Sequence, residues 1–248
     1  MRIAALYDIH ANPDALAAVL DDVRAAGVER LVFGGDVLPG PLPIETLDLI
    51  ASHTLPAHFI AGNGETAVLA HLAGRDLDHL PAAARDAIRW TAGQLRPADR
   101  RLIASWPATV RLTYPTLGDL LFCHATPRSD TEIFTRLTPE ERLLPIFEPA
   151  RASIVVCGHT HMQFIRAVGT TRVVNCGSVG MPFGAPGAYW LLLGDSVELR
   201  RTSYDLDAAA ARIRASQYPQ AQEFAERHVV NPPSEETMLA LMAQGDLR

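Results

Sequence analysis

Five segments of this sequence carry side chains that could bind metal ions, and each segment directly follows an apolar run. The side chains are aspartate, histidine and asparagine, in the order Asp8-Ile9-His10, Gly35-Asp36, Gly62-Asn63, His124 and Gly158-His159-Thr160-His161. The preceding runs predict β-strands at Ile3–Tyr7, Leu31–Phe33, His58–Ala61, Leu120–Cys123 and Ile154–Cys157. Ligands of α/β proteins bind in the crevice beyond the carboxyl ends of the strands. We therefore expect the five segments to converge on one metal site.

The spacing of these side chains suggests more than one ion. Asp8 with His10, and His159 with His161, are two residues apart, and in extended backbone such pairs point to one side, so that each forms half of a cage. Asp36 stands alone, and a single carboxylate can bridge two cations about 3.5–4 Å apart. Oxygen and imidazole donors without thiolate suit Mn, Fe, Zn or Ni. The expected cofactor is a pair of divalent metal ions that share Asp36.

Each of these residues has a structural alternative when it is taken alone. Asp8 and Asp36 could cap helices. His10 or His124 could be a hydrogen-bonded residue at a strand end, and Gly62-Asn63-Gly64 could be a turn. Seven such residues at five strand ends, in a chain with nine histidines, are hard to explain as caps and turns. The combination, rather than any one residue, predicts a metal centre.

The elements that must position these side chains follow a layered pattern. Pro13 opens a helix that Gly27 ends, between the first two strands, and this β-turn-α-β unit favours a right-handed parallel crossover. An Ala-rich helical block follows at 65–105, and three hairpins are expected at 109–123, 162–175 and 189–202. We predict an α/β fold with two mixed β-sheets packed face to face between helical layers, a four-layer αββα sandwich, plus a helical C-terminal tail.

Length and composition limit the architecture and the partners. The 248 residues, 48% of them hydrophobic, suffice for one large core, so we expect a single domain at 1–203 and a helical extension at 204–248 packed on or near it. The net charge of −6 gives no strong nucleic-acid signal. The three cysteines read as small buried residues. No membrane segment is visible, and we expect a soluble cytoplasmic protein, with a homo-oligomer left open.

The ordered motifs resemble those of the calcineurin-like metallophosphoesterases, especially the small bacterial and archaeal phosphodiesterase branch. The resemblance covers Met1 to about Thr202 and includes Asn175-Cys176-Gly177-Ser178-Val179-Gly180. It implies one metal held by Asp8, His10, Asp36 and His161, and a second held by Asp36, Asn63, His124 and His159. It also implies that Asn12 contacts the substrate phosphate. Asp36, Asn63 and Asn12 are thus the candidate catalytic residues.

The expected activity is phosphoester hydrolysis, most naturally of phosphodiesters. Two cations would polarise the phosphoryl oxygens and lower the pKa of a bridging water, so that hydroxide attacks in line. The substrate is then a phosphoester or nucleotide-like small molecule. Nucleotide, dinucleoside polyphosphate or phosphoprotein phosphatases would use the same site. A binding scaffold without catalysis is disfavoured, because none of the expected ligands is missing.

Two further features of the sequence lead to expectations. Many relatives carry histidine directly after the metal-binding asparagine, as a general acid, whereas this chain has Gly64. We expect a preference for good leaving groups and space for a bulky substituent at Gly64. Alternatively, Gly64 serves a turn with positive φ, and His58, His71 or His79 acts as the acid. The Gly177–Gly180 turn, with Ser178, is expected to approach His159, His161 or the substrate.

Overall fold

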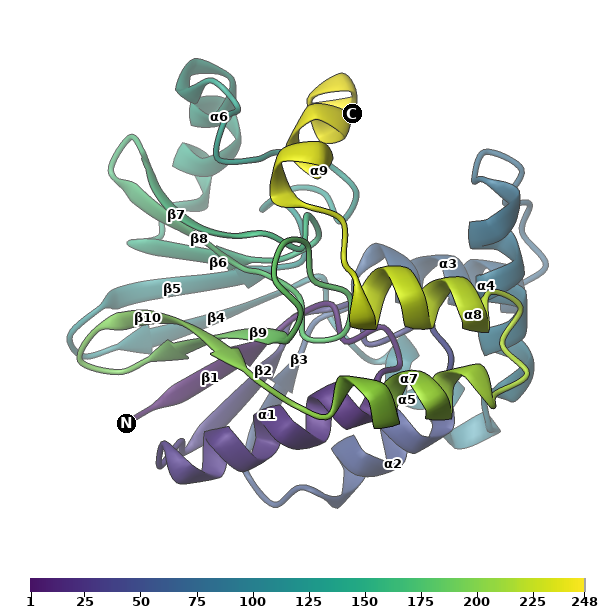
Figure 1. Cartoon of the computed structure of the whole chain (residues 1–248). Coiled ribbons are helices and arrows are strands. Elements are labelled where there is room, and N and C mark those ends of the chain that lie inside the picture. The colour runs from purple at the N-terminus through teal and green to yellow at the C-terminus, as the bar shows by residue number, and fades with distance from the viewer. Residues whose placement is uncertain (248) are drawn as a thin grey trace.

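Short apolar segments form the central strands of both sheets. In the computed structural model, which describes residues 1–247, β1 (Ile3–Leu6) and β6 (Ile154–Cys157) are buried along their whole length. Each is the middle strand of a five-stranded sheet (Figure 1). A strand covered on both faces is apolar throughout, which explains the absence of alternation in both segments.

The first sheet is built around β1. On one side, β2 (Arg30–Phe33) and β3 (Ala57–Phe59) are added in parallel. On the other side, the hairpin of β9 (Ala188–Leu193) and β10 (Val197–Thr202) is antiparallel. Helices α1 (Pro13–Ala25) and α2 (Pro43–Ser52) connect the parallel strands.

The second sheet has the same mixed character. Its parallel strands are β5 (Gly118–Cys123), β6 and β8 (Thr171–Cys176), and its antiparallel edges are β4 (Thr109–Tyr114) and β7 (Gln163–Val168). Helix α6 (Glu140–Phe147), followed by a 3₁₀ turn at Glu148–Ala150, packs on its outer face. The prediction of two mixed sheets is confirmed.

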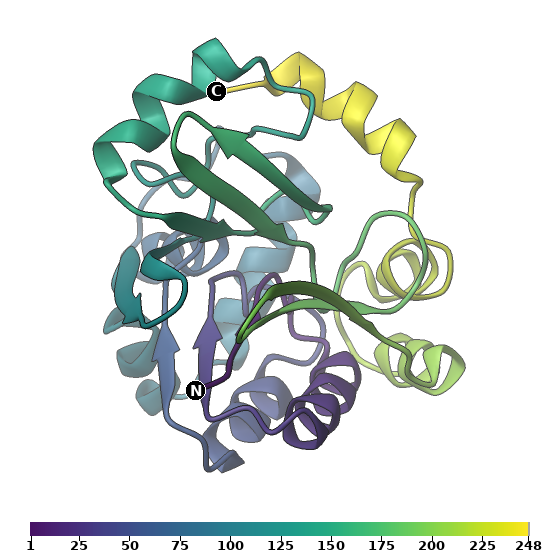
Figure 2. The ribbon, with the colours of Figure 1, turned by 90° about the vertical axis from the view of Figure 1, so that its left-hand side faces the viewer.

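Alternate residues of the central strands face different layers. Ala5 of β1 and Val156 of β6 belong to the core between the sheets. Leu6 of β1 faces the core under α1 and α2, and Val155 of β6 faces the core under α6. Figure 2 shows α6 outside one sheet and α1 outside the other. The four-layer arrangement is therefore as predicted.

The remaining helices lie outside the sandwich. They are α3 (Asn63–Leu72), α4 (Ala82–Gln94) and α5 (Pro97–Ala104), and, in the tail, α7 (Leu206–Arg214), α8 (Ala221–Phe224), a π-helical segment at Ala225–Val230, α9 (Glu235–Met242) and a 3₁₀ turn at Ala243–Gly245. The first tail helices pack with Leu42 and Ala87, and Leu239 of α9 packs with Met162 and Phe183. Within residues 1–247, none of the helices has the length and apolarity needed to cross a membrane.

Candidate metal centre

The backbone at the strand ends is left-handed rather than extended. Positive φ values occur at five of the predicted ligands: Asp8 (54°), His10 (47°), Asp36 (49°), His159 (67°) and His161 (57°). The expectation of extended pairs is therefore wrong. A left-handed backbone at a residue other than glycine costs on the order of 1–3 kcal/mol, and it persists only where the surrounding structure enforces it. Such residues are common at functional sites.

Backbone hydrogen bonds between two strand-end loops enforce this conformation. Asp8 N donates to Gly35 O at 3.1 Å, and His10 N donates to Asp36 O at 2.9 Å. The loops after β1 and β2 are thereby joined residue by residue. Asp8, His10 and Asp36 are held on a common rigid support at the carboxyl end of the first sheet.

Asp8, His10 and His161 form one cluster of candidate metal ligands. The Nε2 atoms of His10 and His161 lie 3.2 Å apart, and those atoms lie 3.9 and 3.3 Å from Asp8 Oδ1. All three side chains are buried. Asp8 Oδ1 is the one buried side-chain oxygen within residues 1–247 that has no hydrogen-bond partner. An orphaned carboxylate oxygen among imidazoles fits a cation site, because leaving it unpaired is costly.

A second cluster contains Asp8, Asp36 and His124. His124 Nε2 lies 3.5 Å from Asp36 Oδ1 and 3.0 Å from Asn63 Oδ1. Asp36 Oδ2 faces the other way and lies 3.8 Å from His10 Nε2. The Asp36 carboxylate thus stands between the two groups, with one oxygen towards each.

His159 lies beside the second cluster but is turned partly away from it. Its ring is 5.2 Å from the ring of His124, while its Nε2 is 3.2 Å from Thr131 O. Its backbone N donates to Asp8 Oδ2 at 2.8 Å. His159 and His161 therefore contact different oxygens of Asp8, His159 through its backbone N at Oδ2 and His161 through its ring at Oδ1.

The histidines of the two clusters are fixed through their other ring nitrogen. The Nδ1 atoms of His124, His161 and His10 lie 3.0, 2.7 and 3.3 Å from the carbonyl oxygens of Gly34, Met181 and Pro39. A carbonyl can only accept, so it selects the tautomer with the proton on Nδ1. Each Nε2 is then left with a lone pair for a cation, as is usual for metal-binding histidine.

The charges of the clusters disfavour a site without cations. Burial, together with the Asp8 charge, raises the pKa of Asp36 well above its usual value. Burial also acts to raise the pKa of Asp8, but His161, His124 and His10 outweigh it and lower that pKa. Burial lowers the pKa of His10 and of His159 to about 3. The imidazoles of His10 and His159 are thus neutral, whereas at His161 the charge of Asp8 outweighs burial and raises the pKa. Imidazole nitrogens beside two carboxyl groups are a donor set that fits divalent ions.

Glu65 supports the centre, although sequence reasoning did not single it out. It is fully buried, and its carboxylate accepts from Asp36 N (2.9 Å), Leu38 N (2.8 Å) and Gly62 N (2.8 Å). Burial and the neighbouring Asp36 raise the pKa of Glu65 to about 7. Its place three residues after the N-cap Gly62, the acidic position of a capping box, was the available signal.

Asn12 caps the helix that follows the first ligand pair. The side chain is fully buried, its Oδ1 accepts from Ala15 N at 3.2 Å, and its Nδ2 donates to Gly180 O at 3.3 Å. It serves as the N-cap of α1. The structure shows this capping role, and the contact of Asn12 with a substrate phosphate stays a prediction.

The Gly177–Gly180 turn contacts the backbone of Asp8 and leads into a residue that holds the ring of His161. Ser178 Oγ donates to Asp8 O at 2.7 Å, and Gly180 N donates to the same oxygen at 3.0 Å. A Cβ at Gly180 would lie 1.8 Å from Ile9 O. The turn supports the backbone of Asp8, and Met181, directly after it, places its carbonyl oxygen 2.7 Å from His161 Nδ1, in line with the expected approach to His161.

The expectations of free space and of a positive φ at Gly64 are wrong. Its φ is not positive, and the position that a Cβ would take is occupied, at 2.1 Å from Leu38 O. There is no room there for a substituent of the substrate. Glycine is required because Gly64 N donates to Asp36 Oδ1 at 2.7 Å while the Leu38 carbonyl packs against it.

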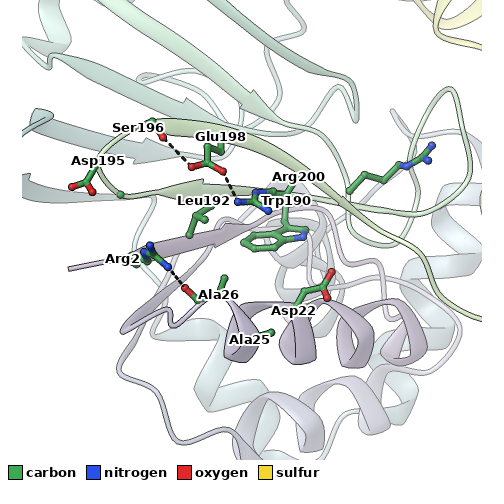
Figure 3. A pocket seen from close by; sticks show the side chains of 12 residues that line it. Arg2, Asp22, Ala25, Ala26, Trp190, Leu192, Asp195, Ser196, Glu198 and Arg200 are labelled. Atoms are coloured by element: carbon green, nitrogen blue, oxygen red, sulfur yellow. Dashed lines mark hydrogen bonds and ion pairs between the residues drawn. The ribbon is translucent and has the colours of Figure 1, made fainter.

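A cavity of about 400 Å³ adjoins the metal centre between α3 and α4. It is lined by His10, Asp36 and Asn63, and of the three alternative acids it contains His79. A larger pocket, of about 530 Å³, lies before β1, where Arg2 and Asp22 line it with Trp190 (Figure 3). That pocket is at the opposite end of β1 from Asp8, and it holds none of the predicted ligands.

Comparisons with known proteins agree with the layered fold and the motifs. The family description "calcineurin-like phosphoesterase superfamily domain" matches residues 1–195. An uncharacterized protein of Methanocaldococcus jannaschii is 26% identical over 238 residues, which cover 88% of this chain and 94% of that protein. A hypothetical protein of Pyrococcus horikoshii shares the fold with a TM-score of 0.79 at 18% identity, over 94% of this chain and 99% of that one. A metallophosphoesterase of Sphaerobacter thermophilus has a TM-score of 0.69 at 25% identity, over 92% of this chain and 97% of that one.

Proposed function

This chain belongs to the calcineurin-like phosphoesterase superfamily, and on that premise we propose that it is a phosphodiesterase that works with two divalent metal ions. Membership supports a metal-dependent phosphoesterase. The preference for diesters and the number of ions are the further steps of the proposal. They rest on the donor set at the carboxyl ends of the strands.

The observation that carries the proposal is the position of the two carboxylates. Asp8 Oδ1 is buried without a hydrogen-bond partner among three imidazoles. Asp36 directs one oxygen to His10 and the other to His124. Two neighbouring carboxylates in a buried site repel each other, and cations between them remove that repulsion.

We assign the ligands to two groups. Asp8, His10, Asp36 and His161 would hold one ion, and Asp36, Asn63, His124 and His159 the other. When bound, such a pair supplies a Lewis acid for the phosphoryl oxygens and a hydroxide nucleophile at neutral pH.

Hydrogen bonds within the protein hold the donor atoms in position before the substrate binds. The Gly64 N–H holds Asp36 Oδ1, and Glu65 holds the backbone of Asp36 and Gly62. Three carbonyl oxygens hold the imidazole rings. Because the donors need not rearrange, their charges act on the transition state without a reorganisation cost.

No histidine follows Asn63, so the proposal includes a preference for good leaving groups. A positioned general acid contributes roughly 10²–10⁴ in rate and matters most for poor leaving groups. Aryl phosphodiesters and phosphoanhydrides should therefore turn over faster than alkyl esters. Rates that do not depend on the leaving group would instead identify another acid, for which His79 in the adjoining cavity is the candidate.

Metal analysis of the purified protein tests the proposal. We expect about two ions per chain, because two groups of donors share one carboxylate. Mn-loaded enzyme is then assayed on phosphodiesters, monoesters and dinucleoside polyphosphates, with the highest rates expected on diesters. One ion per chain would exclude the shared site, and a preference for monoesters would exclude the assignment as a phosphodiesterase.

A further inference from the structure

The C-terminal tail forms a second cavity beside the metal centre. This cavity, of about 270 Å³, lies between α4 and α8, which are neighbours in Figure 1. It shares His10 and Pro39 with the larger cavity that contains Asp36 and Asn63. A group placed in it would therefore be attached to a phosphate at the metal centre.

Aromatic side chains of the tail line this cavity. Tyr218 and Phe224 meet edge to face, with ring centroids 5.9 Å apart, and Phe224 and His228 are 5.2 Å apart. Met181 adds a flexible thioether on the side of His161. Aromatic rings and methionine favour a planar apolar group. The volume is below the roughly 300–1,000 Å³ of whole small-molecule sites, so it suits one ring system of a larger ligand.

His228 lines the cavity and has a ring nitrogen that lacks a partner. Its Nδ1 is buried and makes no hydrogen bond within the described part of the chain. The residue lies in the π-helical segment Ala225–Val230, and π-helical turns occur frequently at functional sites. Burial lowers the pKa of His228 to about 4, so the ring is neutral near pH 7. A neutral imidazole offers one donor and one acceptor on opposite sides of the ring, so one of them can pair with the edge of a heteroaromatic ring.

We propose that this cavity binds the planar heteroaromatic group of the substrate, such as a nucleobase, stacked on the tail's aromatic rings and hydrogen-bonded to His228. The inference rests on the proposed function and names the substrate class as phosphodiesters of nucleosides. Tyr218, Phe224 and His228 all lie beyond residue 195, where the family match ends. The tail would thus add substrate recognition to a phosphoesterase domain.

The test compares esters that differ only in the group that does not leave. The p-nitrophenyl diesters of thymidine 5′-phosphate, phenyl phosphate and methyl phosphate release the same chromophore. For wild-type enzyme we expect a KM about tenfold lower for the thymidine ester than for the methyl ester, the size of one base stacked on an aromatic ring. The phenyl ester should fall between them, because it cannot pair with His228. Equal KM values for phenyl and thymidine esters would overturn the role of His228.

Two substitutions locate the effect. His228→Leu replaces the imidazole with an apolar side chain and should raise KM about fivefold for the thymidine ester, with kcat and the methyl ester unchanged. Phe224→Leu should act in the same way through lost stacking. Gln222→Leu is the matched control, because Gln222 is an exposed residue of the same tail and does not line the cavity. An equal rise in KM on both esters, or an equal effect of Gln222→Leu, would overturn the proposal.

A binding measurement separates this inference from the proposed function. Calorimetric titration with thymidine 5′-monophosphate, against methyl phosphate as control, requires no turnover. If no diester is hydrolysed but the nucleotide binds and His228→Leu weakens it about fivefold, the cavity assignment stands without the phosphodiesterase. If diesters are hydrolysed and both ligands bind alike, the cavity assignment falls and the proposed function stands.

Discussion

The polar residues at the two ends of β1 differ in burial and in pairing. At the amino end, the pocket of Figure 3 is the larger cavity, and Arg200 pairs with Glu198 while Arg2 donates to Ala26 O. Glu198 also accepts from Ser196 Oγ at 2.9 Å. At the carboxyl end, the polar side chains are buried, their backbone is left-handed, and Asp8 Oδ1 has no partner.

The difference shows that volume alone does not identify a functional site. Exposed charges that satisfy one another contribute little and need no ligand. Buried carboxylates without partners cost free energy that a ligand must offset. The carboxyl end of the sheets is therefore the end at which substitutions should change chemistry, and the amino end should tolerate them.

The largest contrast should come from removing one carboxylate at each end. Asp36→Asn should abolish nearly all hydrolysis, because an amide cannot supply the shared negative charge. The protein should remain folded, since the raised pKa of Asp36 shows that its charge opposes folding in the absence of metal. Glu198→Gln is the control, with activity unchanged. Full activity in metal-replete Asp36→Asn protein would refute the shared site.

A second substitution distinguishes the two ion positions. His124→Ala should lower the bound metal by about one ion per chain and remove most activity, because His124 is assigned only to the second group, where its Nε2 lies 3.0 Å from Asn63 Oδ1. Plasma mass spectrometry of the dialysed protein measures the change. His58→Ala controls for loss of a histidine, since His58 contacts Arg30 instead of the clusters. Retention of both ions would remove His124 from the ligand set.

Glycine positions at the two ends should also respond differently. A Cβ at Gly64 would lie 2.1 Å from Leu38 O, whereas at Gly194, in the amino-end pocket, it meets only Arg2 Cγ at 3.6 Å. Gly64→Ala should lower the free energy of unfolding by roughly 1–3 kcal/mol, as overpacking does. Gly194→Ala should change it little. Thermal unfolding of both variants compares them, and equal melting temperatures would mean that the loop at Leu38 yields.

Because the Leu38 carbonyl leaves no room at position 64, Gly64→His should not restore a general acid. An imidazole at this position would displace Leu38 or Asp36, so it should lower rates on aryl and alkyl esters alike. A selective gain on alkyl esters would show that the loop can open.

The sequence predicted the sheets and the membership in the superfamily because both follow from strong local patterns. Apolar runs defined β1 and β6, and the ligand motifs stand directly after the strands. The errors concern contacts between distant segments. Nothing near Gly64 in the sequence shows that the Leu38 carbonyl oxygen lies where a side chain would be. The left-handed backbone of Asp8 likewise depends on hydrogen bonds to the loop after β2.

The smallest effect should come from removing the last tail helix, α9, which packs on the outside of the carboxyl end of the sheets. Leu239 of α9 packs against Phe183, whose ring stacks on His161 at a centroid distance of 5.2 Å. All seven predicted ligands precede α9, so a chain ending before Ser234 should keep its metal content. Its melting temperature should fall by several degrees, because burying one leucine contributes about 1.5–3 kcal/mol.

Two point variants on α9 test whether the packing of Leu239, rather than the presence of the whole helix, sets the melting temperature. Leu239→Ala should reproduce most of the fall in melting temperature, whereas Leu241→Ala should not, because Leu241 is 56% exposed. Substrate KM is measured alongside, since a looser Phe183 would let the His161 ring move. Loss of metal on truncation would mean that α9 holds the ligand cage itself, and the two ends of the molecule would then differ in their dependence on the tail as well as in their chemistry.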